Sequence, residues 1–308
     1  MHLFSDTVNA LSFDVEEWFQ AEAFAGLFPP ARWERLESRC ETQVGRILDI
    51  LAARGVRATF FVLGWVAQRH GRLVKRIAAA GHEIACHGFG HAMITRQTRE
   101  EFARDVRRAR ELLEDAAGTR VAGYRAPTFS VTERTRWALE VLLDQGFGYD
   151  ASIYPIRHDR YGIPGSPRFP YVVLEGGGRR LWEYPGFTRR IAGMTLPAAG
   201  GGYLRLLPYA WTRGAIRAAH REGRPAAVFA HPWEFDARLP VAPLPRLARL
   251  RHYGGISRNA AKLERLLEEF RFAPVGELLA SLDASRGGGP RNAGAETGDA
   301  AVSRGGLN

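Results

Sequence analysis

Two histidines separated by three residues are the strongest local chemical signal in the sequence. His87 and His91 belong to the segment His-Gly-Phe-Gly-His, and both can bind one metal ion if the chain between them turns like a helix. The glycines of this segment allow the backbone to bend sharply. The alternative is a pair of ordinary surface histidines, but carboxylates elsewhere in the chain favour the metal.

A group of acidic side chains follows a short apolar run near the N-terminus. Asp14, Glu16 and Glu17 come directly after this run, and two aromatic residues follow them. Two histidines and one carboxylate leave coordination positions for water, and a second carboxylate can act as a base. The alternative is a solvated acidic loop, but the aromatic neighbours favour the rim of a site.

Two further residues could take part in the same chemistry. Arg125 precedes Ala-Pro, and its guanidinium could pair with a carboxylate of the site and hold it ionised. His231 follows a strongly apolar run and precedes Pro-Trp-Glu, where it could protonate a leaving amine. The alternatives are a surface arginine and a buried structural histidine.

The elements that must position these residues alternate along the chain. Short apolar runs predict strands, and these lie at 11–15, 58–63, 83–86, 121–125, 149–152, 226–230 and 272–275. Apolar residues at helical spacing predict helices, and these lie at 43–54, 73–80, 98–117, 132–145, 208–222 and 257–270. Strands that alternate with helices indicate an α/β fold with a mostly parallel sheet, and a barrel of β/α units fits this order.

If the fold is a barrel of this kind, the positions of the reactive residues relative to the predicted strands can be checked in the sequence. The chemistry of such barrels gathers at the carboxyl ends of the strands. Reactive residues stand at or near the ends of five predicted strands, namely Asp14, His87, Arg125, Asp150 and His231. The repeated position favours one common site.

Composition narrows the class of protein. The 308 residues include 45% hydrophobic and 25% charged residues, which is ordinary for a globular protein. The formal net charge of +10 is spread over helices that also carry acids, which favours a solvated basic surface over nucleic-acid binding. Cys40 and Cys86 form no CxxC pair. We find neither a leader-like start nor an apolar run long enough to cross a bilayer, and expect a cytoplasmic protein without stable membrane insertion.

Together the motifs resemble those of the polysaccharide deacetylases of the NodB-homology group, also called carbohydrate esterase family 4. The resemblance covers roughly residues 8–283, and its five motifs stand in order at 12–17, 87–91, 125–127, 149–152 and 229–231. It implies a distorted (β/α) barrel and a hydrolase that removes N-acetyl groups from an N-acetylated oligosaccharide or polysaccharide. We expect one deacetylase domain over 1–284, with core motifs within 8–235, and a disordered tail over 285–308.

The resemblance implies a catalytic role for several residues. Asp14 would act as the base and would be oriented by Arg125. His231 would be the general acid, oriented by Asp150. The backbone N–H of Thr128 would stabilise the oxyanion.

It also implies a divalent metal held by His87, His91 and one carboxylate. Zinc is expected from the ligand types, although cobalt or another divalent ion could bind the same ligands. The family carries two adjacent aspartates, but a valine follows Asp14 here, so the ligand is Glu16 or Glu17. We favour Glu16 because residues two apart on an extended chain point to the same side. Glu17 remains open.

A subgroup is closer still. The runs 13–19, 200–209 and 231–234 resemble the exosortase-associated (PEP-CTERM) polysaccharide deacetylases, which are found beside bacterial exopolysaccharide genes. This implies an exopolysaccharide precursor as substrate and a subgroup-specific part at about 155–283. Many relatives carry an aromatic residue at position 128, whereas here Phe129 comes one later. The residues expected to contact sugar are Phe129, Tyr203, Trp233 and Glu234.

Other functions fit parts of the pattern. A hydrolase of another linear or cyclic amide, such as allantoin, could use the same barrel, although the intact pair His87 and His91 argues against its metal-poor members. A catalytically weak glycan-binding protein would need only the basic surface. A scaffold protein would have no use for the reactive strand ends. The sequence carries no prediction of the oligomeric state.

Overall fold

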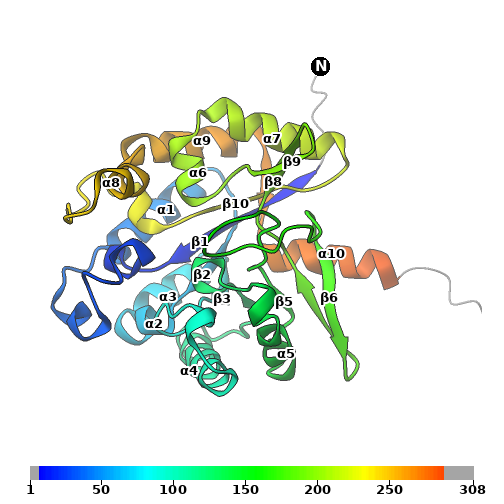
Figure 1. The fold of residues 1–308 in the computed structure, drawn as a ribbon, viewed down its shortest axis with the longest axis horizontal. Helices are drawn as coiled ribbons and strands as arrows, with labels where there is room; N and C mark the ends of the chain where they lie inside the picture. Colours follow the sequence, from blue (N-terminus) through cyan, green and yellow to red (C-terminus); the bar gives the residue numbers. More distant parts are fainter. Residues whose placement is uncertain (1–6, 288–308) are drawn as a thin grey trace, which may run out of the picture.

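A mostly parallel sheet forms the centre of the structure, a computed structural model that describes residues 7–287 (Figure 1). Its strands are Val8–Val15 (β1), Thr59–Val62 (β2), Glu83–Cys86 (β3), Gly123–Tyr124 (β4), Tyr149–Asp150 (β5), Tyr171–Gly176 (β6), Arg179–Glu183 (β7), Ala227–Ala230 (β10) and Arg271–Ala273 (β11). The strand order is β10-β1-β2-β3-β4-β5-β7-β6, and β11 pairs with the first residues of β1. Among these pairs, only β6 and β7 run antiparallel. The predicted α/β class with a parallel sheet is confirmed.

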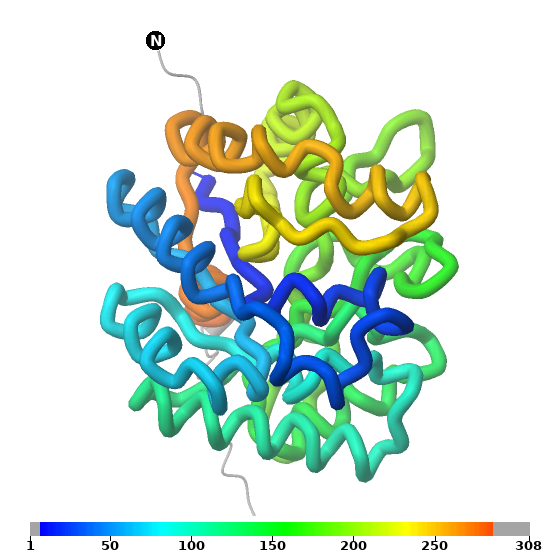
Figure 2. The backbone as a smooth tube through the Cα atoms, turned by 90° about the vertical axis from the view of Figure 1, so that its left-hand side faces the viewer, coloured from blue at the N-terminus to red at the C-terminus, as the bar shows by residue number. Residues whose placement is uncertain are grey.

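Helices surround this sheet, as both the ribbon and the turned tube show (Figures 1 and 2). They are Cys40–Ala52 (α1), Gly64–Arg69 (α2), Gly71–Ala79 (α3), Arg99–Ala117 (α4), Trp137–Asp144 (α5), Gly201–Leu206 (α6), Tyr209–Arg221 (α7), Arg246–Tyr253 (α8), Asn259–Glu269 (α9) and Val275–Gly287 (α10). The main core lies between these helices and the sheet, where apolar side chains of β1 to β3 pack against those of α1, α3 and α4. In the described chain, no helix is long and apolar enough to cross a membrane.

Local chemistry explains where α4 begins and ends. Thr98 accepts a hydrogen bond from the backbone N–H of Glu101 at 3.2 Å, and the Glu101 side chain accepts one from the backbone of Thr98 at 2.8 Å. Gly118 follows the helix with a φ of 67°, a conformation that favours glycine. These reciprocal bonds form a capping box, and the helix predicted over 98–117 is confirmed.

Some elements differ from the prediction. The helix expected over 132–145 is divided into a short 3-10 turn, Glu133–Thr135, and α5. The stretch 155–205, where many Gly and Pro residues predict hairpins and loops, does hold the hairpin β6–β7 and a second hairpin of Thr188–Ile191 (β8) with Met194–Pro197 (β9), but it also contains most of α6. α2, α8 and α10 were not predicted. Because α10 extends to Gly287, the start of the expected disordered tail is helical, and 288–308 lie outside the described residues.

The register brings distant strand ends to one edge of the sheet. Cys86 pairs with Tyr124, so the residues that follow them, His87 and Arg125, leave the sheet side by side. On the other side, Phe13 pairs with Ala230, and their successors are Asp14 and His231. The end strands β10 and β6 are not paired with each other in the described chain, so hydrogen bonds do not close the sheet into a regular barrel.

Candidate active site

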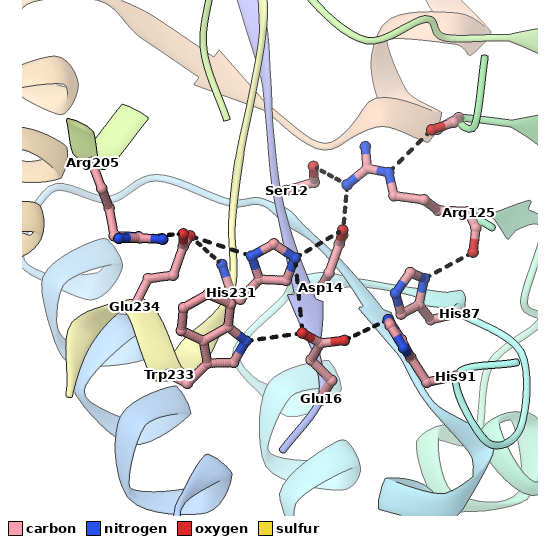
Figure 3. A network of polar contacts seen from close by, with 11 residues as sticks. Ser12, Asp14, Glu16, His87, His91, Arg125, Arg205, His231, Trp233 and Glu234 are labelled. Carbon is pink, nitrogen blue, oxygen red and sulfur yellow. Dashed lines mark hydrogen bonds and ion pairs between the residues drawn. The ribbon is translucent and has the colours of Figure 1, made fainter. Parts of the chain in front are cut away.

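A cavity of roughly 200 Å³ opens at the carboxyl ends of β1, β3 and β10. Acidic and imidazole side chains form its polar part, and Figure 3 shows them pointing toward one another: Asp14, Glu16, His87, His91 and His231. The rest of the wall is largely aromatic and includes Phe129, Tyr154, Tyr161, Tyr203, Phe229 and Trp233. The cavity therefore joins a compact polar centre to an aromatic surface.

Glu16, His87 and His91 form a group that can hold a metal ion. One ligand atom from each lies within 4.8 Å of the others. Nδ1 of His87 lies 2.8 Å from the backbone oxygen of Arg125, which fixes this ring and leaves Nε2 for a metal. Nε2 of His91 lies 2.7 Å from Oε2 of Glu16, a buried oxygen that accepts no well-directed hydrogen bond. These donors fit a divalent ion.

The surroundings also set the charge of these ligands. Burial lowers the pKa of His87 to about 4, so its imidazole is neutral at neutral pH, as a ligand must be. Burial alone would raise the pKa of Glu16, but the neighbouring His91 outweighs it and lowers this pKa below its usual range. A neutral imidazole at His87 and an ionised carboxylate at Glu16 are the forms in which these two side chains bind metal.

Glu17 points away from this group and stabilises the start of α1. Its carboxylate accepts hydrogen bonds from the Ser38 hydroxyl and from the backbone N–H groups of Arg39 and Cys40, the latter two at 3.0 and 3.3 Å. An acid at a helix N-terminus satisfies donors that the helix leaves free. Of the two acids left open by the sequence, only Glu16 lies with the histidines.

Asp14 and Arg125 form a buried ion pair at the edge of the cavity. Nη1 of Arg125 donates to Oδ1 of Asp14 at 2.6 Å and also to the Ser12 hydroxyl at 2.9 Å. Nε of Arg125 donates to the backbone oxygen of Ala151 at 3.1 Å, and its guanidinium lies over the Phe61 ring. The arginine is therefore fixed on several sides, and it holds the carboxylate in one orientation.

His231 stands across the cavity from the histidine pair. Its Nε2 lies 3.9 Å from Oδ2 of Asp14 and 4.0 Å from Oε1 of Glu16, and its Nδ1 lies 3.3 Å from Oε2 of Glu234. Burial alone would lower the pKa of His231, but the contact with Glu234 and the nearby carboxylates raise it to about 9. The imidazole is thus held in its protonated form, which a general acid requires.

Glu234 was expected to contact sugar, and the structure contradicts this. Its side chain is fully buried, and both of its oxygens are engaged by the protein. Oε1 accepts a hydrogen bond from Nε of Arg205 at 2.6 Å, while Oε2 accepts one from the backbone N–H of His231 at 2.9 Å. Arg205 is itself buried and also donates to the backbone oxygens of Arg251 and Gly254. Glu234 therefore contacts and positions His231 instead of a sugar.

Asp150 was expected to orient His231, and its surroundings contradict this as well. Its carboxyl accepts a hydrogen bond from the Ser152 hydroxyl and lies beside Glu183. Burial raises the pKa of Asp150 to about 6 and holds that of Glu183 well above its usual range. The two carboxyls are close enough to share a proton behind Arg125. Among the described residues, the carboxylates that form ion pairs with His231 are Asp14, Glu16 and Glu234, and Asp150 is not one of them.

The remaining predicted residues line the cavity. Thr128 and Phe129 have positive φ values of 56° and 52°, a conformation that costs energy for residues other than glycine and is frequent at functional sites. Tyr203 lies on α6. The indole N–H of Trp233 donates to Oε1 of Glu16 at 2.9 Å, so this side chain fixes the acid as well as lining the wall.

Sequence reasoning missed several residues of the wall. Tyr154 and Tyr161 gave no spacing signal because they come from an irregular stretch, and Phe229, although part of the motif 229–231, reads as an interior residue of β10. Gly200 and Gly201 allow a close approach: a Cβ on Gly200 would meet the Phe229 ring at 2.1 Å, and both glycines have positive φ. The run 200–209 was noticed only for its resemblance, and its glycines were the available signal.

Two family models match this chain, in adjacent parts. Residues 37–143 match the model described as polysaccharide deacetylase, and residues 151–280 match one described as a domain of unknown function, DUF3473. The first region contains the histidine pair and Arg125. The second contains His231, Glu234 and much of the aromatic wall.

Curated relatives match the first region. A peptidoglycan-N-acetylglucosamine deacetylase of Bacillus cereus is 34% identical over 96 residues, which are 31% of this chain and 35% of that protein. A chitooligosaccharide deacetylase of Rhizobium leguminosarum bv. trifolii is 42% identical over 72 residues, 23% of this chain and 34% of that protein. The chain thus spans about a third of the length of these relatives. The matches support the resemblance to the polysaccharide deacetylase family.

Solved structures match the fold over nearly the whole chain. A protein described as a polysaccharide deacetylase from Mycobacterium smegmatis is similar with a TM-score of 0.60 and 22% identity, covering 98% of this chain and 96% of that chain. PuuE allantoinase is similar with a TM-score of 0.59 and 19% identity, covering 91% of each chain. At these identities the likeness concerns the fold alone, and it confirms the predicted (β/α) barrel type.

Proposed function

We propose that this protein is a metal-dependent hydrolase that removes N-acetyl groups from an N-acetylated saccharide. One observation carries the proposal: Glu16, His87 and His91 converge at a cavity whose wall also holds Asp14 and His231. Hydrolysis of an amide needs a base for water and an acid for the departing amine, on either side of the reacting carbon. The saccharide deacetylases among the relatives support an acetamido sugar as substrate.

Zinc is the metal we propose, because two imidazoles and one carboxylate are ligands that it accepts readily. A divalent ion bound by Glu16, His87 and His91 would supply Lewis acidity toward water and toward the acetamide oxygen. The chain orients these ligands in advance, through the backbone of Arg125 on His87 and through Trp233 on Glu16. Cobalt could occupy the same donors.

The other residues then divide the proton transfers. Arg125 occupies Oδ1 of Asp14, so Oδ2 can take a proton from water as the water oxygen bonds to the acetyl carbon. His231 gives its proton to the amide nitrogen as the carbon–nitrogen bond breaks, and acetate and a free amino sugar result. Glu234 holds the imidazole in place. We assign the backbone N–H of Thr128 to the oxygen that becomes negative.

The aromatic wall supports a sugar as the bound group. Phe129 and Tyr203 lie on it with Tyr161, whose hydroxyl is 3.3 Å from that of Tyr203. Aromatic rings offer flat apolar surfaces on which the faces of a sugar can lie, while hydroxyl groups fix its orientation. The runs 200–209 and 231–234 supply part of this wall, and through their resemblance we propose a bacterial exopolysaccharide precursor as substrate.

Acetate release from a panel of N-acetylated oligosaccharides tests the proposal. Treatment with a chelator should abolish release, and added zinc or cobalt should restore it, because the ligands form an open metal site. Allantoin belongs in the panel as a cyclic amide. Full activity in protein shown to be metal-free by elemental analysis would contradict the metal, and turnover of allantoin alone would contradict the saccharide.

The pair Glu16 and Glu17 provides a matched control. Glu16→Gln should lower zinc occupancy and activity, and excess zinc should restore part of the activity. Glu17→Gln should keep the zinc but lower the melting temperature, because it weakens the hydrogen bonds at the start of α1. Loss of zinc from Glu17→Gln, with full occupancy in Glu16→Gln, would reverse the assignment.

A further inference from the structure

A group of apolar side chains is exposed on α8, its preceding loop and the end of α6. Leu247 and Leu250 are 60% and 61% exposed, and Val241 is 66% exposed. Leu206 is 42% exposed and flanks Gly254 together with Leu250. We call these four side chains the leucine patch. Exposed leucines are common singly, but a group of them on one protruding element marks an interaction surface.

The same segment carries only positive charge. Every charged residue between positions 237 and 263 is basic, and the arginines are Arg238, Arg246, Arg249, Arg251 and Arg258. The ion pairs among the described residues involve none of these arginines. Some arginines elsewhere do find acids, as Arg213 on α7 does with Glu269 at 2.6 Å. The segment therefore offers unpaired positive charge beside apolar surface.

These two properties together select one kind of partner. A nucleic acid or an acidic polysaccharide would neutralise the arginines but would leave the leucines in water. An anionic lipid bilayer uses both, since leucines enter the boundary between headgroups and acyl chains while arginines stay at the level of the phosphates. The contact would be peripheral, because no described helix is suited to cross a membrane.

The leucine patch is firmly connected to the cavity. His252 of α8 is buried, and its ring stacks on that of Trp233 with centroids 4.4 Å apart. The same indole stacks on His231 at 5.2 Å. A second hollow beside the cavity shares Trp233 with it and includes Leu247 and Arg251 in its lining. α8 lies at the edge of the ribbon, and its side of the molecule faces the viewer in Figure 2.

We propose that the leucine patch and the arginines around it dock on the surface of an anionic lipid bilayer. Leu247 and Leu250 enter the interface, and Arg246 and Arg249, which alternate with them on α8, contact lipid phosphates. This docking holds the cavity beside the bilayer, where a saccharide attached to a lipid would be within reach. The docking surface contains none of the residues to which we assign metal binding or proton transfer.

Sedimentation of the full chain with vesicles tests the docking. Vesicles of phosphatidylcholine with about one third phosphatidylglycerol should bind the protein, and binding to pure phosphatidylcholine should be at least about tenfold weaker. The double variants Leu247→Ser/Leu250→Ser and Arg246→Glu/Arg249→Glu should each weaken binding to the mixed vesicles by about tenfold or more. All four side chains are exposed, so circular dichroism should show an unchanged fold.

Matched control variants test whether binding to vesicles depends on this surface or on any exposed apolar side chain or positive charge. Met194→Ser removes an equally exposed apolar side chain from the β8–β9 hairpin, and Arg104→Glu/Arg107→Glu reverses two exposed charges on α4. Both should bind the mixed vesicles like the wild type. Equal weakening by these controls, or no binding by the wild type, would overturn the proposal. Loss of binding in the arginine variant with full binding in the leucine variant would also overturn it, since any polyanion would then suffice. The measurement needs no substrate, so its result is separate from the proposed hydrolysis.

Discussion

Two buried arginine–carboxylate pairs flank the cavity, and they differ in what the carboxylate faces. Asp14 accepts Arg125 on one oxygen and keeps the other toward the cavity. Glu234 has both oxygens engaged, one by Arg205 and one by His231. Removing one partner from either buried pair leaves an uncompensated charge, which typically costs about 3–5 kcal/mol. The same pairing thus orients one acid toward substrate and the other toward a neighbouring side chain.

The largest effect should come from the carboxylate that faces the cavity. Asp14→Asn should lower kcat for acetate release by about 10²–10⁴-fold, because an amide cannot take a proton from water. Zinc content, measured by elemental analysis, should stay near that of the wild type. Excess zinc should not restore the rate.

A partly buried arginine–carboxylate pair serves as the control for this substitution. Asp236 accepts a hydrogen bond from Nε of Arg39 at 2.5 Å, away from the cavity. Asp236→Asn should lower the melting temperature, because it breaks a pair that stabilises the fold. It should leave kcat within about a few-fold of the wild type, because this pair does not contact the cavity. Loss of zinc from Asp14→Asn would show that Asp14 is a metal ligand. Its pair with Arg125 could then no longer be compared with the pair of Glu234 and Arg205.

A smaller effect is expected from the carboxylate that faces the protein. Glu234→Gln should lower kcat by about 10–100-fold with little change in KM, since the glutamate only positions His231. Against the opposing effect of burial, Glu234 helps to raise the pKa of His231 to about 9. Without this carboxylate that pKa falls, so the alkaline limb of the pH–rate profile should move to lower pH. An unmoved limb would show that Glu234 does not act on the proton donor.

The smallest effect should follow Asp150→Asn. This carboxyl is bonded to Ser152 and lies with Glu183, so its change should leave the alkaline limb in place and kcat within about a few-fold. The pH–rate profile of acetate release measures both. If Asp150→Asn moved the limb as far as Glu234→Gln, the acid that holds His231 would have been misassigned.

The strand ends could be predicted from the sequence because the signal there is local. The predicted strand 83–86 coincides with β3, and the predicted strands that end near Asp14 and His231 correspond to β1 and β10. A buried parallel strand is a short apolar run, and a reactive side chain directly after it stands out. The choice of Glu16 over Glu17 rested on the alternation of an extended chain, and the structure places Glu16 with His87 and His91.

The contacts that hold His231 in place could not be predicted from the sequence, because they join residues that lie far apart along the chain. Arg205 and Glu234 are 29 positions apart. Taken separately, Arg205 is an ordinary basic residue, and Glu234 is an acid expected to bind sugar. Only the fold shows that both are buried against each other. The Gly and Pro residues of the stretch 155–205 predict hairpins and loops, but its apolar residues have no regular spacing, so side chains of the aromatic wall such as Tyr161 gave no pattern to recognise.

The position of β1 has a consequence for synthesis on the ribosome. This strand, which carries Asp14 and leads to Glu16, emerges before the other described strands, yet Ala10 pairs with Ala227 and with Ala273 near the far end of the described chain. Pairings across such long sequence separations slow folding, because the intervening chain must be ordered before they form. β1 therefore waits for strands made more than two hundred residues later. A nascent chain arrested before β10 would present both acids without His231 to face them.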